Sequence, residues 1–246
     1  MNRKYTEPHY EFRVFGHEFG TLINPLLVPS SRKWREVFTQ AALPITELAP
    51  EAHDAGSQTY LLTTDTQSCS IKVRAHQLDT KVLLRQQQGL GRWQPHLQLA
   101  FPLTAAFLRE FLFAWLEVEP PHLRRAQYTE AQFLQELIVP NPAICAVQVH
   151  KQRRCFTVNG CTMEITALTV NQRYHTHTVA VEAVEAAKVL NTITRLGLQS
   201  FANTNYLAGL RQLMGLDATA KSWSDVEPTF APVGQQITSP QLVMVR

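Results

Sequence analysis

Apolar and polar residues alternate along much of this chain, which is the pattern of half-buried β-strands. Short polar connections separate several alternating runs, and Asn159-Gly160 is a strong hairpin-turn signal between two of them. Pro95 predicts an edge or a bulge in the run that contains it. The pattern predicts strands over Tyr10–Phe15, Gln58–Thr64, Ser68–Ala75, Leu78–Gln86, Trp93–Leu99, Ala146–Lys151, Arg154–Val158, Cys161–Val170 and His175–Ala183.

Helical spacing of apolar residues replaces this alternation in five segments. Thr104 and Thr129 stand where N-cap residues are expected. The two helices that begin there separate the two groups of strands, so we interpret residues 103–140 as a helical insertion. The five predicted helices are Ser31–Ala42, Thr104–Leu116, Thr129–Val139, Val184–Leu196 and Asn205–Met214. Between the first helix and the second strand, residues 44–56 are expected to form a loop.

We predict an α+β fold: an eight-stranded antiparallel β-barrel with helices inserted mid-chain and at the C-terminal side. A closed barrel accounts for about eight short strands, in two groups of four, with few exposed edges. An open sheet with helices on one face is the alternative. Residues 1–216 are expected to form one domain, and residues 217–246, which are poorly periodic, a loosely packed C-terminal arm.

Composition narrows the class of protein. Hydrophobic residues make up 45% of the 246 positions and charged residues 17%, enough apolar residue for a packed core. A net charge of +3 is too mild to demand nucleic acid as a partner. The N-terminal residues show no secretory signal, no long apolar run suggests a membrane span, and the four cysteines form no CxxC pair. We therefore expect a cytoplasmic protein with no membrane partner.

Charged residues gather on one face of almost every predicted strand, because positions two apart share a face. Arg and Lys bind phosphate oxygens, and carboxylates hold Mg²⁺ or Mn²⁺. Periodicity alone favours a solvated face, since antiparallel sheets often have one face in water. The sets that share a face are His9, Glu11 and Arg13; Lys72 and Arg74; Asp79, Lys81 and Arg85; Lys151 and Arg153; Thr162, Glu164 and Thr166; and Glu182 with Thr178.

The order and spacing of these residues resemble the CYTH superfamily, the triphosphate tunnel metalloenzymes. The resemblance covers residues 9 to 214. The family's entry motif ExExK is matched by His9-Tyr10-Glu11-Phe12-Arg13, its RxR by Lys72-Val73-Arg74, its following lysine by Lys81, its KxR-like strand by Lys151-Gln152-Arg153, its exit motif ExE by Ala180-Val181-Glu182, and its Ser-Tyr pair by Asn205-Tyr206.

The resemblance implies an eight-stranded tunnel that binds a triphosphate or polyphosphate small molecule with Mg²⁺ or Mn²⁺. The only nucleic acid that it implies as a partner is an RNA, bound through its 5′-triphosphate end. The resemblance is also compatible with a homodimer. The phosphate-binding residues would be Arg13, Lys72, Arg74, Lys81, Arg85, Lys151 and Arg153; the metal ligands Glu11, Glu164 and Glu182; and the catalytic residues Glu11, Glu182 and Lys81.

Two departures from the family pattern fall on the acidic side of the site. His9 and Ala180 stand where the entry and exit motifs have their first carboxylates. A neutral imidazole suits Mn²⁺ better than Mg²⁺, which prefers oxygen. The leading hypothesis is a metal-dependent triphosphatase; the alternatives are a polyphosphate- or nucleotide-binding module without activity and a nucleotidyl cyclase.

Overall fold

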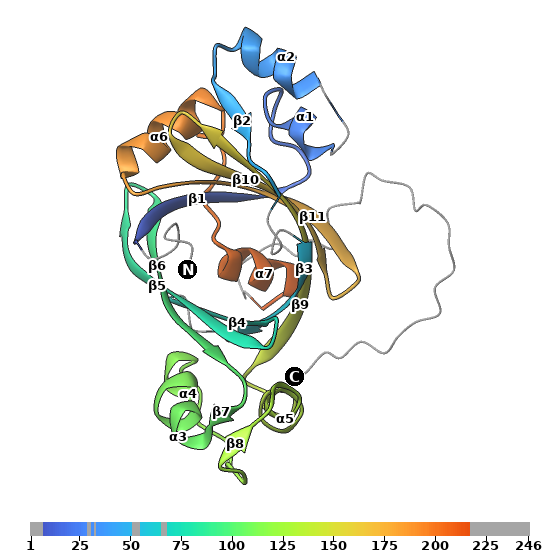
Figure 1. The fold of residues 1–246 in the computed structure, drawn as a ribbon, viewed down its shortest axis with the longest axis vertical. Coiled ribbons are helices and arrows are strands. Elements are labelled where there is room, and N and C mark those ends of the chain that lie inside the picture. The colour runs from blue at the N-terminus through green and yellow to red at the C-terminus, as the bar shows by residue number, and fades with distance from the viewer. Residues whose placement is uncertain (1–6, 29–30, 32, 51–54, 65–67, 217–246) are drawn as a thin grey trace, which may run out of the picture.

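A closed ring of antiparallel strands forms the centre of the protein (Figure 1). The computed structural model describes residues 7–28, 31, 33–50, 55–64 and 68–216; the predicted arm 217–246 lies outside them. The strands are β1 (His9–Gly16), β2 (Ile45–Glu47), β3 (Ala55–Leu62), β4 (Cys69–Arg74), β5 (Gln77–Gln87), β6 (Leu90–Ala100), β7 (Leu103–Thr104), β8 (Gln127–Tyr128), β9 (Cys145–Val158), β10 (Cys161–Val170) and β11 (Tyr174–Ala183).

Eight of these strands make the ring, in the order β10-β11-β1-β6-β5-β4-β3-β9, and pairing of β9 with β10 closes it. Every pairing is antiparallel. The α+β class and a ring of eight antiparallel strands agree with the sequence prediction; the nine predicted segments become eight strands because two of them are joined in β9. The open sheet, the alternative, is wrong because β9 and β10 pair along ten residues, Val149–Val158 with Cys161–Val170.

Two details of the strands differ from the prediction. The predicted strands 146–151 and 154–158 are one strand, β9, because alternation continues through Gln152 and Arg153 without a turn residue. The segment predicted as a loop contains β2, which pairs with β9 from Val158 to Phe156. This stretch of β9 lies beyond Gln152, where its pairing with β3 ends.

The helices lie on the outside of the ring, with one exception. In Figure 1, α1 (Asn24–Leu27), α2 (Lys33–Gln40) and α6 (Ala186–Arg195) lie at one end of the view, and the mid-chain segments at the other. The mid-chain segments contain π-helical turns, so each predicted helix is broken into pieces. These pieces are α3 (Ala105–Phe107), η2 (Leu108–Leu112), α4 (Phe113–Trp115), α5 (Glu130–Gln132) and η3 (Phe133–Ile138). Thr104 and Thr129 cap them as predicted.

Helix α7 (Tyr206–Met214) lies within the outline of the ring (Figure 1). Asn205 caps its first turn by accepting a hydrogen bond from the Ala208 N–H. Its leucines pack against inward-facing residues of β3, β9 and β10, including Leu62, Val149 and Leu168. At Gly209 the helix approaches β1 so closely that a Cβ atom would collide with the Phe15 ring. One part of the interior is therefore filled by apolar contacts with α7.

Polar side chains line the remainder of the interior, and apolar ones face outward. On β1, for example, Phe12 and Val14 belong to the outer core beneath α6 and α2, and the alternate residues Glu11 and Arg13 point inward. On β4, Ile71 and Val73 contribute to the outer core under the mid-chain segments. Among the described residues, no helix is long and apolar enough to cross a membrane.

Candidate functional site

Arg13 is the centre of the charged interior, where it holds three carboxylates. Its guanidinium donates to Glu11 Oε1 at 2.9 Å and to Glu164 Oε1 at 3.0 Å, and it lies 3.5 Å from Glu182 Oε1. The ring of Tyr206 stacks on it at 4.3 Å. With only 3% of its surface exposed, Arg13 acts as a buried cross-link between β1, β10 and β11.

Ala180 explains how Arg13 reaches Glu164. In the strand register, Arg13 is opposite Ala180, and Ala180 is opposite Glu164. The methyl group of Ala180 leaves room for the guanidinium to pass over it to the next strand. The small side chain of Ala180 thus lets Arg13 reach an acid on β10.

Glu164, which the sequence predicts to be a metal ligand, is paired with basic side chains. It does not belong to the group of potential metal ligands formed by His9, Glu11 and Glu182. Besides Arg13, it accepts from Arg153 at 2.8 Å and from Thr166 at 3.0 Å. Burial would raise its pKa, but Arg13 and Arg153 lower the pKa of Glu164 to about 2. The carboxylate is therefore ionised and saturated with donors.

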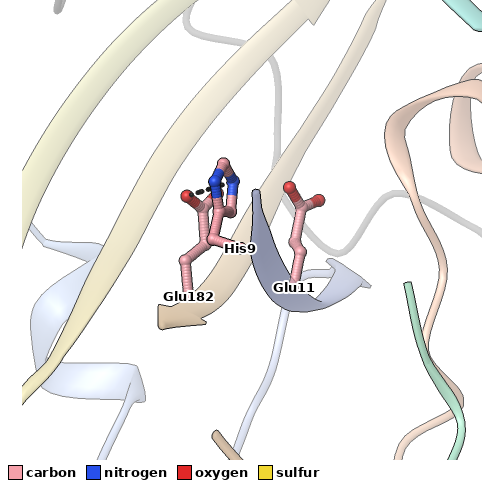
Figure 2. Close-up of side chains that lie close together, drawn as sticks. All are labelled: His9, Glu11 and Glu182. Atoms are coloured by element: carbon pink, nitrogen blue, oxygen red, sulfur yellow. Dashed lines mark ion pairs between the residues drawn. The ribbon is translucent and has the colours of Figure 1, made fainter. Parts of the chain in front are cut away.

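His9, Glu11 and Glu182 form the only group of three metal-ligating side chains found in the described part of the chain. One donor atom from each lies within 4.8 Å of the others, and His9 Nε2 is 3.2 Å from Glu182 Oε2. Figure 2 shows the three side chains pointing to the same side of β1 and β11. Two oxygens and an imidazole nitrogen are a donor set that fits Mn²⁺ and, less well, Mg²⁺.

Glu11 and Glu182 stand directly opposite each other in the β1–β11 register. Like charges at such a position repel unless cations lie close by. Burial would raise the pKa of Glu182, but Lys81, His9 and Arg13 lower it well below its ordinary value. The Glu182 carboxylate is thus ionised and surrounded by positive charge.

Lys81 supplies one of these cations from β5. Its ammonium nitrogen lies 3.4 Å from Glu11 Oε2 and 3.2 Å from His9 Nε2. Its side chain is 32% exposed, against 7% for Glu11, so it reaches the group from the more open side.

Four more predicted phosphate-binding residues also lie in the interior. Arg74 pairs with Asp79, and Arg153 with Glu164. Lys151 donates to Tyr60 Oη at 2.9 Å and lies 3.8 Å from the centroid of the Tyr206 ring. Lys72 forms no ion pair within the described residues.

The crowding of basic side chains lowers the pKa values of Lys72 and Lys151. Burial, together with the neighbouring charges of Arg74, Lys81 and Arg153, lowers the pKa of Lys72 to about 7. Burial and Lys72 itself lower the pKa of Lys151 well below its ordinary value. The charged cluster described above consists of six basic side chains and four carboxylates: Arg13, Lys72, Arg74, Lys81, Lys151 and Arg153 against Glu11, Asp79, Glu164 and Glu182.

Arg85 lies outside this interior, contrary to the shared face inferred from the sequence. Leu84 has no partner in the β5–β6 register, where Leu83 pairs with Trp93 and Arg85 with Arg92. This β-bulge inverts the alternation of faces. Arg85 therefore donates to the hydroxyl of Tyr10, which belongs to the outer face of β1.

A pocket of about 130 Å³ opens beside Glu11. Asn203 forms part of the pocket wall. Its side chain also links the segment before α7 to β1, because it accepts a hydrogen bond from the Arg13 N–H and donates one to the Glu11 carbonyl. The pocket lining is Glu11, Leu83, Gln86, Gly89, Leu90, Gly91, Trp93, Asn203 and Asn205.

Sequence reasoning assigned no role to Tyr60, Asp79 or Asn203. Tyr60 is an aromatic residue in an apolar run, and only the pairing of β3 with β9 brings it to Lys151. His9, which the sequence offers as a substitute ligand, belongs to the group of three.

No family model matches the chain, and no curated protein matches it in sequence. Among solved structures, it is similar to a conserved hypothetical protein from Pyrococcus furiosus, at 13% identity over 80% of this chain and 98% of that one, with a TM-score of 0.37. A protein from Pyrococcus horikoshii matches at 11% identity over 81% and 98%, with a TM-score of 0.38. A Bacillus halodurans protein titled "putative adenylate cyclase" matches at 10% identity over 82% and 95%, with a TM-score of 0.36. Likenesses this distant do not indicate an activity.

Proposed function

We propose that the interior of the ring is a tunnel that binds the triphosphate or polyphosphate group of a small molecule, together with a divalent cation, and hydrolyses its terminal phosphate. The substrate is inorganic triphosphate or a nucleoside or other organic triphosphate. The proposal makes the protein a member of the triphosphate tunnel metalloenzymes, the family that its residues resemble.

Buried positive charge in excess of the neighbouring negative charge is the observation that carries this proposal. Lys72 and Lys151 lie in an interior where burial and neighbouring cations lower their pKa values. Such an arrangement costs free energy, and an anion bound among these cations would lower that cost. A polyphosphate supplies several closely spaced negative oxygens, which match cations spread over β4, β5 and β9.

His9, Glu11 and Glu182 are the residues that would hold a divalent cation. Bound there, Mn²⁺ or Mg²⁺ would neutralise phosphate oxygens and lower the pKa of a coordinated water. Arg13 positions both carboxylates by holding one oxygen of each. Lys72, Arg74, Lys151 and Arg153 would stabilise the charge that develops on the transferred phosphoryl group.

A binding module without activity is the second candidate, and the engagement of Arg13 favours it. Because Arg13 takes an oxygen from both Glu11 and Glu182, fewer carboxylate oxygens are left for a cation. Ala180 adds none.

The test is phosphate release from tripolyphosphate and ATP with Mg²⁺ or Mn²⁺, alongside tripolyphosphate binding by calorimetry. We expect Glu182→Gln to abolish release and leave metal-free binding largely intact. Glu185→Gln, an exposed acid at the start of α6, is the matched control and should behave as wild type. Binding without release would establish the module, and a cyclic product from ATP the cyclase. An RNA with a 5′-triphosphate is a further substrate to include. Absence of tripolyphosphate binding would overturn the proposal.

A further inference from the structure

The group of His9, Glu11 and Glu182 already contains a cation that belongs to the chain. Arg13 takes the Oε1 atoms of Glu11 and Glu182, which leaves their Oε2 atoms for other partners. Glu182 Oε2 faces His9 Nε2, and Glu11 Oε2 faces the ammonium group of Lys81. The same ammonium lies 3.2 Å from His9 Nε2. Lys81 thus contacts two of the three donor atoms that a metal ion would use.

We propose that Lys81 is a tethered cation that takes the place of the metal ion in the ligand-free protein and leaves it when phosphate binds. This inference rests on the proposed function, because it concerns how the same site acquires its metal. Its consequence is that metal and triphosphate bind cooperatively: each is bound weakly alone and more tightly in the presence of the other.

Electrostatics and hydrogen bonding both exclude joint occupancy. A divalent cation a few ångströms from an ammonium group, in a site where Glu11 is 7% exposed, is strongly repelled. His9 Nε2 has a single in-plane position, which holds either a lone pair or a hydrogen, so it cannot bind a metal ion while it is hydrogen-bonded to Lys81 or to Glu182. Lys81 must therefore withdraw before the three ligands can converge on a metal ion.

The position of Lys81 allows that withdrawal. It is among the more exposed of the interior cations, at 32% of its side chain, and its flexible stem starts from β5. Arg153 and Lys81 each lower the pKa of Lys72, so both lie close enough to Lys72 to interact with it electrostatically across the interior. A phosphate chain held by those residues offers the ammonium new oxygen partners. By linkage, the factor by which phosphate strengthens metal binding equals that by which metal strengthens phosphate binding.

The experiment measures Mn²⁺ affinity by calorimetry, with no phosphate present, for wild type, Lys81→Gln and Lys72→Gln. Both variants remove one basic side chain from the interior, but only Lys81 contacts ligands of the group, Glu11 and His9. We expect Lys81→Gln to bind Mn²⁺ about tenfold or more tightly than wild type, within the usual range of coupling between sites. Lys72→Gln should change the affinity much less. Adding His9→Ala to Lys81→Gln should remove the gain, which places the bound ion at this group.

Equal Mn²⁺ affinity in wild type and Lys81→Gln, or equal gains in Lys81→Gln and Lys72→Gln, would overturn the inference. Should Lys81→Gln fail to fold, Lys81→Met and Lys81→Arg give the same comparison: the first should bind Mn²⁺ tightly and the second weakly.

Tripolyphosphate binding to wild type in the presence of a chelator separates the two proposals. If that binding is absent, the proposed function fails whatever the Mn²⁺ result; if it is present and the variants are alike, only the tethered cation fails.

Discussion

Single residues decide the electrostatics of the interior, and Lys72 is the one with the clearest consequence for pH. Its pKa of about 7 results from burial first and from Arg74, Lys81 and Arg153 next, with Asp79 opposing them. A phosphate anion would favour the charged form and raise this pKa. Binding should therefore take up a proton at neutral pH.

The prediction for Lys72 is a loss of affinity for tripolyphosphate as the pH rises from about 6 to 8.5, the range around its pKa of about 7. Lys72→Met should bind more weakly at pH 6 by about 1.5–3 kcal/mol, the worth of a hydrogen bond to a charged group. Calorimetry at several pH values checks this. The ligand's own titration affects both proteins, so the difference between them isolates Lys72. Parallel pH profiles would contradict the prediction.

Glu164 is the residue whose loss should cost most stability. Glu164→Gln leaves Arg13 and Arg153 buried with less counter-charge, which typically costs about 3–5 kcal/mol. Urea unfolding at pH 7 measures it. Because the pKa of Glu164 is lowered to about 2, its contribution is present above the unfolded pKa and is lost as the pH falls toward 2.

Glu47→Gln is the control for that measurement. Glu47 pairs with Arg154 at 2.7 Å on the outside of the ring, with its side chain 34% exposed. A solvent-exposed pair of this kind is worth about 0–1 kcal/mol. Similar losses in both variants would show that the interior network is not special.

At the scale of elements, the placement of α7 depends on Gly209. Gly209→Ala would drive a Cβ atom into the Phe15 ring of β1. Overpacking of this kind costs about 1–3 kcal/mol, and it should displace α7 and the neighbouring Tyr206. Unfolding by urea, with tripolyphosphate binding as a second measurement, tests this.

Phe15→Leu combined with Gly209→Ala provides the control. Leucine is smaller than phenylalanine, so the double variant should recover part of the stability lost by Gly209→Ala alone. Additive losses would mean that the close approach does not limit the position of the helix.

The bulge at Leu84 makes a prediction about two arginines on neighbouring strands. Arg85 lies outside the ring with Tyr10, whereas Arg74 lies inside with Asp79. Arg74→Gln should weaken tripolyphosphate binding by about 1–3 kcal/mol, and Arg85→Gln should leave it near wild type. Calorimetry on both variants decides the matter, and a large loss at Arg85 would refute the assignment of faces.

At the scale of the molecule, the proposed ligand would connect β4, β5 and β9, and its metal ion would add β1 and β11. Saturating tripolyphosphate should therefore raise the melting temperature. At one hundred times the dissociation constant, the free energy of unfolding should increase by about 2.7 kcal/mol. Sulfate at equal ionic strength is the control, since it cannot span the same cations. An equal rise with sulfate would indicate a general anion effect.

The sequence by itself determined most of the strands, two helix caps and the composition of the charged faces. Alternation is a local property, so β4 and β10 could be predicted from their own residues, as could the caps Thr104 and Thr129. The order of basic and acidic residues was also sufficient to select most of the residues that meet inside the ring.

Only the tertiary structure decided which face turned inward and which residues meet. Closure of β9 on β10 requires contacts between segments far apart in the chain, and no local pattern encodes it. The bulge at Leu84 sent Arg85 outward, although its spacing from Lys81 is that of a shared face. The three-ligand group likewise depends on the β1–β11 register, which sets Glu11 opposite Glu182 and brings Lys81 across from β5. The physical reason is that periodicity specifies faces one strand at a time, whereas a site is made where several strands meet.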